Sequence, residues 1–235
     1  NKGNRTVAIR KPCVTVKYMK DGESQYHVDF AVYSAGNSDE KVYLAKGKEF
    51  SASTEISWEI AEPKKLKDLI NSKFNSSDEK EQFKRIIRLL KRWKDNKFLS
   101  EGNNAPTGIA LTALVYENFQ PIITKDLFTG EIKIDDLSAL KELLNRLIYP
   151  NYFNTHLPVE PRNNLFKKMT ELQKNSLNDK LKELKNTIQE AINDADPYSA
   201  CEKLQKAFGE EFPLPDKKET AQKCTPAITS SQEQA

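Results

Sequence analysis

Two different spacings of apolar residues divide the chain. Up to about residue 62, apolar residues alternate with polar ones, which is the pattern of half-buried β-strands. One such run covers residues 13–18, a second covers residues 26–33, and Asp21-Gly22 between them predicts the turn of a β-hairpin. After Pro63, apolar residues recur every three or four positions, which predicts helices. The chain is therefore predicted to be an α+β protein.

The helical part contains predicted helices of different character. The helix of residues 77–97 has one apolar stripe, whereas the helix of residues 107–119 is apolar on nearly all sides and is expected at the centre of this part. Residues 216–235 are polar and are predicted to be disordered. The predicted parts are thus the strands of residues 1–62, the helices of residues 63–215 and the tail of residues 216–235. The other predicted helices cover residues 63–74, 135–149, 163–195 (one helix or a pair) and 199–208.

Asp29 is the residue of the second strand that needs an explanation. Strand alternation places Val28, Phe30 and Val32 on the face toward the core, and Asp29 with Tyr33 on the other face. A carboxylate in an otherwise apolar strand is costly unless a partner neutralises it. Two explanations stay open: Asp29 faces water from an edge strand, or it ligates a metal ion.

The composition indicates a globular protein and argues against several classes of binding site. The chain has 235 residues, of which 37% are hydrophobic and 30% charged, and this suits one large or two small globular domains. A net charge of +3 argues against binding nucleic acid over the whole surface, so any anion must be bound by a local cluster. Three cysteines without metal-type spacing fit a reducing cytoplasm without disulfides, and two histidines argue against zinc.

The apolar runs and the start of the sequence lead to two further expectations, one about membranes and one about the length of the natural protein. No apolar run approaches the ~20 residues of a membrane-spanning helix, and no signal segment is seen, so no membrane partner is expected. The sequence starts at Asn1 without a methionine and enters a strand almost at once. We therefore expect it to begin inside a longer protein.

A basic segment and a helix start could bind phosphate. Residues 84–97 contain seven basic residues and one acid, and such runs are usually solvated helix faces. Lys91, however, lies about 40° from Ile87 at the edge of the apolar stripe, so its side chain can extend toward a cleft and a triphosphate. Thr107 and Gly108 precede the most apolar helix, where exposed amides and a hydroxyl suit a phosphate. Alternatively, Thr107 only caps that helix.

The chain resembles the cGAS/DncV-like nucleotidyltransferases (CD-NTases), the cyclic-oligonucleotide synthases of bacterial antiphage defence, which are related to oligoadenylate synthases. The ordered set of four segments carries this resemblance from about residue 5 to residue 215, although no single motif is specific. It implies the C-terminal part of a polymerase-β-like nucleotidyltransferase sheet followed by an oligoadenylate-synthase-like helical domain. The segments are His27-Val28-Asp29-Phe30-Ala31-Val32-Tyr33, Arg88-Leu89-Leu90-Lys91-Arg92-Trp93, Pro106-Thr107-Gly108-Ile109-Ala110-Leu111-Thr112 and Phe208-Gly209-Glu210-Glu211-Phe212-Pro213-Leu214-Pro215.

The resemblance also implies roles for four residues. Asp29 matches the third carboxylate of a site in which three acids hold two Mg²⁺ ions. Lys91 matches the helix lysine that contacts the donor triphosphate, and Thr107 lies where a hydroxyl of the same pocket is expected. Tyr33 could stack on a base, although packing explains it equally well.

One departure from the family is serious. The Gly-Ser loop and the paired Asp-x-Asp motif of the family do not occur in this sequence, and Asp135-Asp136 only opens a predicted helix. Because one carboxylate cannot hold two Mg²⁺ ions, the 235 residues are expected to be inactive by themselves. The intact protein is expected to be cytoplasmic and to join ATP or GTP into a cyclic di- or trinucleotide in antiviral signalling, with release of pyrophosphate.

Besides a pseudoenzyme that serves as a scaffold, two alternatives stay open. The first is another nucleotidyl transfer on the same fold, to RNA, tRNA or a protein. The second is a non-catalytic helical module that binds nucleic acid or a regulatory protein through residues 84–97. Such a module would bind with a steep dependence on salt and would not need Asp29.

Overall fold

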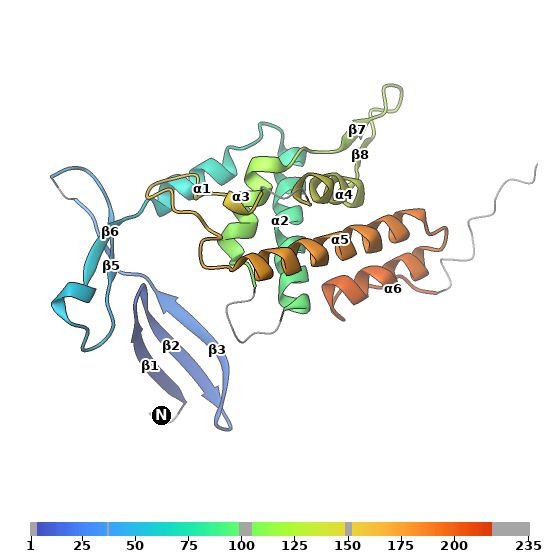
Figure 1. Cartoon of the computed structure of the whole chain (residues 1–235). Helices are drawn as coiled ribbons and strands as arrows, with labels where there is room; N and C mark the ends of the chain where they lie inside the picture. Colours follow the sequence, from blue (N-terminus) through green and yellow to red (C-terminus); the bar gives the residue numbers. More distant parts are fainter. Residues whose placement is uncertain (1–3, 37, 99–104, 149–151, 218–235) are drawn as a thin grey trace, which may run out of the picture. The chain divides into compact units, whose positions relative to one another are not determined.

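The computed structural model describes residues 4–36, 38–98, 105–148 and 152–217 (Figure 1). The chain divides into two compact units. The first, the strand unit, contains the residues up to Ile70 together with Leu157–Asn163, and the second, the helical unit, contains Asn71–His156 and the residues from Asn164 onward. The division thus lies within the first helix, a few residues after the change of pattern at Pro63.

The strand unit contains two antiparallel sheets. Strands β2 and β3 form the hairpin that the sequence predicts, and Asp21 and Gly22 turn between them with positive φ angles. The second sheet has the order β4-β5-β6, and the 3₁₀ helix Ser53–Glu55 precedes β6. Helix α1 begins at Pro63, a residue preferred in the first turn. The bounds are β1 Arg5–Arg10, β2 Cys13–Lys20, β3 Glu23–Phe30, β4 Tyr33–Ser34, β5 Tyr43–Lys46, β6 Ser57–Ile60 and α1 Pro63–Asn71.

The first sheet, of order β1-β2-β3, has one polar and one apolar face. On the polar face Thr15 pairs with Asp29, and on the apolar face Val28 pairs with Val16. The prediction that the apolar face of β3 lies in the core is wrong, since Phe30 is 56% exposed and Val28 and Val32 are exposed as well. The periodicity identified the face correctly, but Phe30 and Val28 are not buried by any described residue of the strand unit.

The predicted strand of residues 26–33 is two separate strands. Strand β3 ends at Phe30 opposite Val14, near the start of β2, so no further partner is available there. The chain then joins the second sheet, where the carbonyl of Val32 accepts the N–H of Ala45 and Tyr33 pairs with Leu44. Tyr33 is therefore not on the strand that carries Asp29.

The helical unit has the helices that the sequence predicts, with one correction (Figure 1). The segment of residues 163–195 is not helical from its start, because α5 begins only after Thr170, which caps it. The short hairpin β7–β8 was not expected, since strands of three residues carry no periodicity. The bounds are α2 Ser77–Lys97, α3 Gly108–Asn118, β7 Ile123–Lys125, β8 Ile132–Ile134, α4 Asp136–Leu147, the 3₁₀ helix Tyr152–Asn154, α5 Glu171–Asn193 and α6 Pro197–Phe208.

The core of the molecule lies among these helices. Every residue of α3 from Ala110 to Val115 is buried, which confirms the prediction that this helix is central. The other helices each contribute fully buried side chains, such as Leu90 of α2, Leu143 of α4, Ile188 of α5 and Phe208 of α6. Burial of this many large apolar side chains is the main stabilising term for a helical unit.

Two further expectations concern the whole chain. Except for Asp216 and Lys217, the tail of residues 216–235 lies outside the described residues. Among the residues that are described, no helix combines the length and the apolar character that crossing a bilayer requires.

Candidate nucleotide and metal site

Asp29 lies on the polar face of the first sheet with partners from two strands. Its Oδ1 accepts a hydrogen bond of 2.6 Å from the hydroxyl of Thr15, which is directly opposite on β2. Its Oδ2 lies 3.9 Å from Nε2 of His27, two residues earlier on the same strand face. The side chain of Asp29 is 50% exposed, so the carboxylate keeps much of its hydration while Thr15 fixes its orientation.

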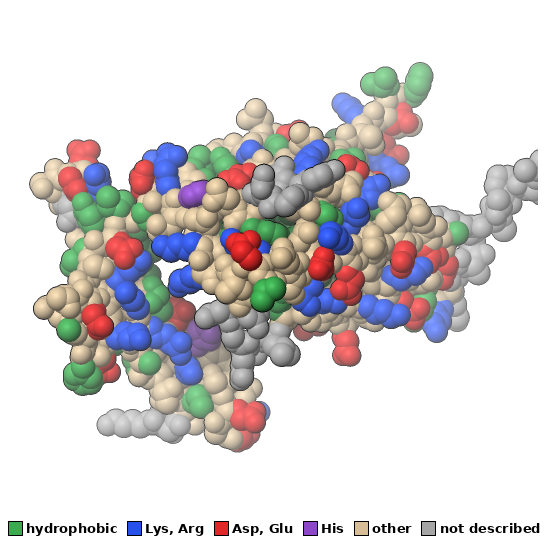
Figure 2. Space-filling view, in the orientation of Figure 1, with side chains coloured by type: hydrophobic (Ala, Val, Ile, Leu, Met, Phe, Trp, Pro, Cys, Tyr) green, Lys and Arg blue, Asp and Glu red, His purple; other side chains and the backbone are tan. Residues whose placement is uncertain are grey.

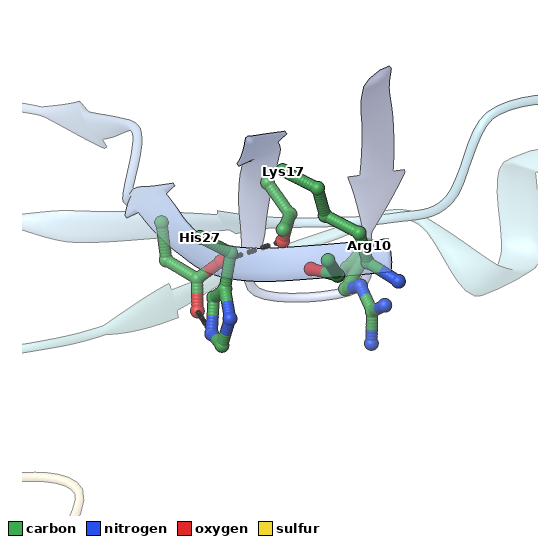
Figure 3. Close-up of a pocket in the computed structure, with 6 residues that line it drawn as sticks. Arg10, Lys17 and His27 are labelled. Carbon is green, nitrogen blue, oxygen red and sulfur yellow. Dashed lines mark hydrogen bonds and ion pairs between the residues drawn. The ribbon is translucent and has the colours of Figure 1, made fainter. Parts of the chain in front are cut away.

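A pocket of about 210 Å³ opens at this carboxylate (Figure 3). Besides Asp29, Thr15 and His27, it is lined by Arg10, Lys17 and Ser24. The positive charges of Arg10 and Lys17 can attract a phosphate-bearing ligand, and the carboxylate of Asp29 can supply one ligand to a metal ion. Among the described residues, however, no group of three histidine, cysteine or acidic side chains could hold a metal ion. The described residues therefore do not form a two-metal site by themselves.

Tyr33 lies at a different place in the strand unit. It lines a pocket of about 760 Å³ together with Val42, Ile60 and the first residues of α1. No residue of this pocket also lines the pocket of Asp29. The expectation that Tyr33 shares the face of Asp29 is therefore wrong, because the strand breaks between them. Its stacking on a base stays a prediction.

Lys91 extends over the start of α3 in the helical unit. A Cβ atom added to Gly108 would lie 3.5 Å from Cε of Lys91 and 4.0 Å from its Nζ. Burial lowers the pKa of the Lys91 ammonium group, and Lys94 lowers it further, whereas Asp95 raises it. Among the described residues, no carboxylate lies within ion-pair distance of Lys91. A partly buried lysine without a counterion is unfavourable, and a bound anion would relieve this cost.

Thr107 has the capping role that the sequence left as an alternative. Its Oγ1 accepts the N–H of Ala110 at 3.2 Å, and its carbonyl accepts the N–H of Leu111. The N–H groups of Gly108 and Ile109 have no acceptor inside the helix, as in any first turn. These amides, the positive end of the helix dipole and the Lys91 ammonium group are the elements of a phosphate site. The structure thus brings Lys91 to the Thr107-Gly108 helix start.

The basic segment that includes Lys91 is largely neutralised. Five of its seven cations form ion pairs within the helical unit, and among the described residues only Arg88 and Lys91 have no such partner. Figure 2 likewise shows basic and acidic side chains interspersed over the visible face of this unit. The pairs are Lys84–Glu81, Arg85–Asp136, Arg92–Glu211, Lys94–Asp95 and Lys97–Glu183. This pairing leaves little of the electrostatic surface that nucleic-acid binding requires.

The four predicted residues fall into two pairs. Asp29 and Tyr33 belong to the strand unit, whereas Lys91 and Thr107 belong to the helical unit. Their convergence on one triphosphate stays a prediction. Sequence reasoning missed Thr15 as the partner of Asp29. Counting back from the Asp21-Gly22 turn places Thr15 opposite Val28, and it is the β-bulge between Tyr18 and Met19 that shifts the register so that Thr15 pairs with Asp29.

Comparison with known proteins bears on the fold. No family model matches the chain. A curated cyclic GMP-AMP synthase of Escherichia albertii is 24% identical over 119 residues, which are 49% of this chain and 26% of that protein. This chain therefore spans only about a quarter of that relative.

Solved structures match over most of the chain. Escherichia coli DncV bound to 3′-deoxy GTP is 19% identical with a TM-score of 0.62, and the match covers 88% of this chain and 52% of that one. Vibrio cholerae DncV, described as a cyclic AMP-GMP synthase and prokaryotic cGAS homologue, is 18% identical with a TM-score of 0.65 over 90% of this chain and 54% of that one. The predicted fold class and the resemblance to cGAS/DncV-like nucleotidyltransferases are confirmed, and this chain spans about half of those structures.

Proposed function

We propose that this chain is the C-terminal part of a nucleotidyltransferase that joins nucleoside triphosphates into a cyclic di- or trinucleotide in antiviral signalling. The observation that supports it most is the likeness over about nine tenths of the chain to DncV structures, which are those of a cyclic AMP-GMP synthase and of forms bound to 3′-deoxy GTP or 3′-deoxy ATP. One such structure of Vibrio cholerae DncV holds the linear intermediate 5′ pppA(3′,5′)pG. These ligands belong to the relatives, and for this chain nucleoside triphosphates are the proposed substrates.

The arrangement at the start of α3 supports a triphosphate in particular. Lys91 has no counterion among the described residues, and it lies over amides that the helix leaves unpaired. In the proposal Lys91 binds the phosphate oxygens, and the N–H groups of Gly108 and Ile109 donate to the same anion. Because the lysine is partly buried, it would hold the anion more strongly than a fully solvated lysine.

Asp29 has the proposed role of a metal ligand. Mg²⁺ prefers carboxylate oxygens, and Thr15 presents one oxygen of Asp29 in a fixed orientation. Asp29 would hold Mg²⁺ together with further carboxylates, and the metal would supply charge stabilisation for the phosphate and activation of the attacking hydroxyl. Since the described residues supply only this one carboxylate, we propose that the remaining carboxylates come from sequence outside these 235 residues.

The test requires the intact protein, including the sequence upstream of Asn1. It is incubated with ATP, GTP and Mg²⁺, and pyrophosphate release is measured together with the mass of the phosphatase-resistant product. Asp29→Asn is expected to lower kcat at least about 100-fold, because a metal ligand is lost. Asp21→Asn is the matched control, since asparagine tolerates the positive φ of that turn, and it should leave activity unchanged.

A second pair of variants separates catalysis from surface binding. Lys91→Gln should raise the KM for the nucleotide about tenfold, through loss of one charge-assisted contact, while Arg88→Gln one turn earlier should not. A helical module that binds nucleic acid would instead lose affinity with both variants and none with Asp29→Asn. Absence of pyrophosphate release from a folded intact protein with every nucleotide mixture would overturn the proposal. A product that nuclease digests would instead indicate RNA or tRNA as the acceptor.

A further inference from the structure

Thr15 is the only buried residue of the first sheet among those that the structure describes. It is 2% exposed, and because β2 is the central strand, Thr15 lies between Ala8 of β1 and Asp29 of β3. A hydroxyl that has lost its contact with water needs a partner within the protein. That partner is the carboxylate of Asp29, so the most buried polar side chain of the sheet contacts the candidate metal ligand.

The hydrogen bonds around Thr15 have one possible direction. An ionised carboxylate only accepts, so the Thr15 hydroxyl donates to Oδ1 of Asp29, and their distance of 2.6 Å is typical of a strong, charge-assisted bond. The Sγ atom of Cys13 lies 3.6 Å from the same hydroxyl oxygen. Since the hydroxyl proton is already used, the thiol of Cys13 donates to Thr15. The hydroxyl is thus fixed from both sides.

The second oxygen of Asp29 is left without a protein donor. Among the described residues Oδ2 accepts no hydrogen bond, and Nε2 of His27 is 3.9 Å away, which is too far for one. The side chain of Asp29 is half exposed and lines the pocket of about 210 Å³ (Figure 3). One oxygen of the carboxylate is therefore held by the sheet, and the other is available to a ligand.

A β-bulge creates this pairing. Counted from the turn, a regular hairpin would place Val14 opposite Asp29. The register shift between Tyr18 and Met19 moves the pairing by one residue, so that Thr15 lies opposite Asp29 instead. Bulges recur next to active sites, where they turn a side chain into position. In this hairpin the bulge gives Asp29 a neighbour with a hydroxyl in place of one with only methyl groups.

We propose that Thr15 is a positioning residue of the nucleotidyl-transfer site, which holds Asp29 in the orientation in which Oδ2 binds a divalent cation. The proposal rests on the proposed function, since it takes Asp29 as a metal ligand. A carboxylate that is held before the cation arrives loses less side-chain entropy on binding than one that rotates freely. Partners that orient metal ligands in this way typically contribute about 10- to 100-fold to metal affinity.

The test measures the binding of a divalent cation to the intact protein, including the sequence upstream of Asn1. Mn²⁺ replaces Mg²⁺, and free Mn²⁺ is measured by electron paramagnetic resonance in a titration without nucleotide, so that the result does not depend on turnover. Thr15→Val keeps the shape of the side chain but removes the hydroxyl, and it should raise the Kd for Mn²⁺ about tenfold. Thr15→Ser keeps the hydroxyl and should raise the Kd by less than about twofold.

A kinetic measurement separates positioning from loss of structure. With ATP, GTP and Mg²⁺, Thr15→Val should raise the Mg²⁺ concentration for half-maximal activity about tenfold, while kcat at saturating Mg²⁺ should fall less than about threefold. Thr6→Val is the matched control and should change neither quantity. Thr6 lies on the same face of the sheet at an exposed position of β1, and its side chain has no hydrogen bond among the described residues.

Three results would overturn the proposal. They are an unchanged Mn²⁺ affinity of Thr15→Val, a loss of affinity in Thr15→Ser equal to that in Thr15→Val, or a fall in kcat without a change in the Mg²⁺ requirement. If Asp29→Asn weakens Mn²⁺ binding and Thr15→Val does not, only the positioning role fails. If Asp29→Asn leaves both Mn²⁺ binding and activity unchanged, Asp29 is not a metal ligand, and its proposed role fails together with that of Thr15.

Discussion

The two units of this chain contrast in how they bury apolar surface. In the helical unit, five helices share a core of fully buried side chains, whereas among the described residues of the strand unit only Thr15 and Val159 are buried. The first sheet nevertheless has a well-formed apolar face, with Val7 66% exposed. A sheet of three strands is stable only when such a face packs on another layer. Correct local structure and a complete core are therefore separate properties, and only the helical unit has both.

The sharpest test of this contrast compares two alanine variants. Leu90→Ala in the helical core should lower the free energy of unfolding by about 3 kcal/mol, from lost transfer energy and the cavity that remains. Val7→Ala on the exposed sheet face should change it by less than about 0.5 kcal/mol. Urea unfolding followed by far-UV circular dichroism measures both. A loss with Val7→Ala equal to that with Leu90→Ala would mean that the sheet face is covered after all.

Replacing the buried polar residue Gln82 in the helical core should lower the free energy of unfolding by less than Leu90→Ala does, but still clearly. Gln82→Ala removes both hydrogen bonds to the backbone of Ile122, which leaves the N–H of Ile122 without a partner, whereas its carbonyl still accepts the N–H of Asp135. The expected cost is about 2 kcal/mol. Gln189→Ala, which loses only an exposed hydrogen bond to Asn193, is the control and should cost well under half of that. Equal urea midpoints for the two variants would show that the base of the hairpin is not part of the core.

The smallest expected effect depends on pH and concerns the junction of α5 and α6. Hydrogen bonds from Lys203, from Ser199 and from the N–H of Asp196 lower the pKa of Asp194 from 3.8 to about 2. A pKa that is lower in the folded state means that the carboxylate stabilises the fold above about pH 4 and loses this contribution as the pH falls toward 2. Asp194→Asn should thus destabilise the chain at neutral pH and progressively less in acid. Urea midpoints measured across this range would contradict the assignment if the difference stayed constant.

The sequence predicted those elements whose apolar pattern is long and whose backbone hydrogen bonds form within the element itself. The stripe of residues 77–97 and the apolar segment of residues 107–119 both became helices at nearly the expected bounds, because each helix satisfies its backbone locally. The β7–β8 hairpin was missed, since its strands are too short to show a period. Residues 164–170 were taken as helix because Leu165 and Met169 fit a helical spacing, yet they lie in a loop where Phe166 and Met169 are buried.

The candidate site shows the same limit. The pattern identified the strand face of Asp29, but alternation cannot show where a strand changes sheets, and so Tyr33 was assigned to the wrong face. Thr107 had two interpretations, and the structure shows the cap without excluding the phosphate. The approach of Lys91 to Gly108 depends on how two helices pack, which the spacing along either helix does not encode.

The absence of a side chain at position 108 has one more consequence. A methyl group there would make only ordinary van der Waals contact with Lys91, and the residue does not have the left-handed φ that favours glycine. Neither helix packing nor chain geometry demands glycine in this turn, where alanine would form helix more readily. The fold alone therefore does not explain why the chain accepts the lower helix propensity of glycine at position 108. The space that the missing side chain leaves above the first amides of α3 is room that an incoming anion could use.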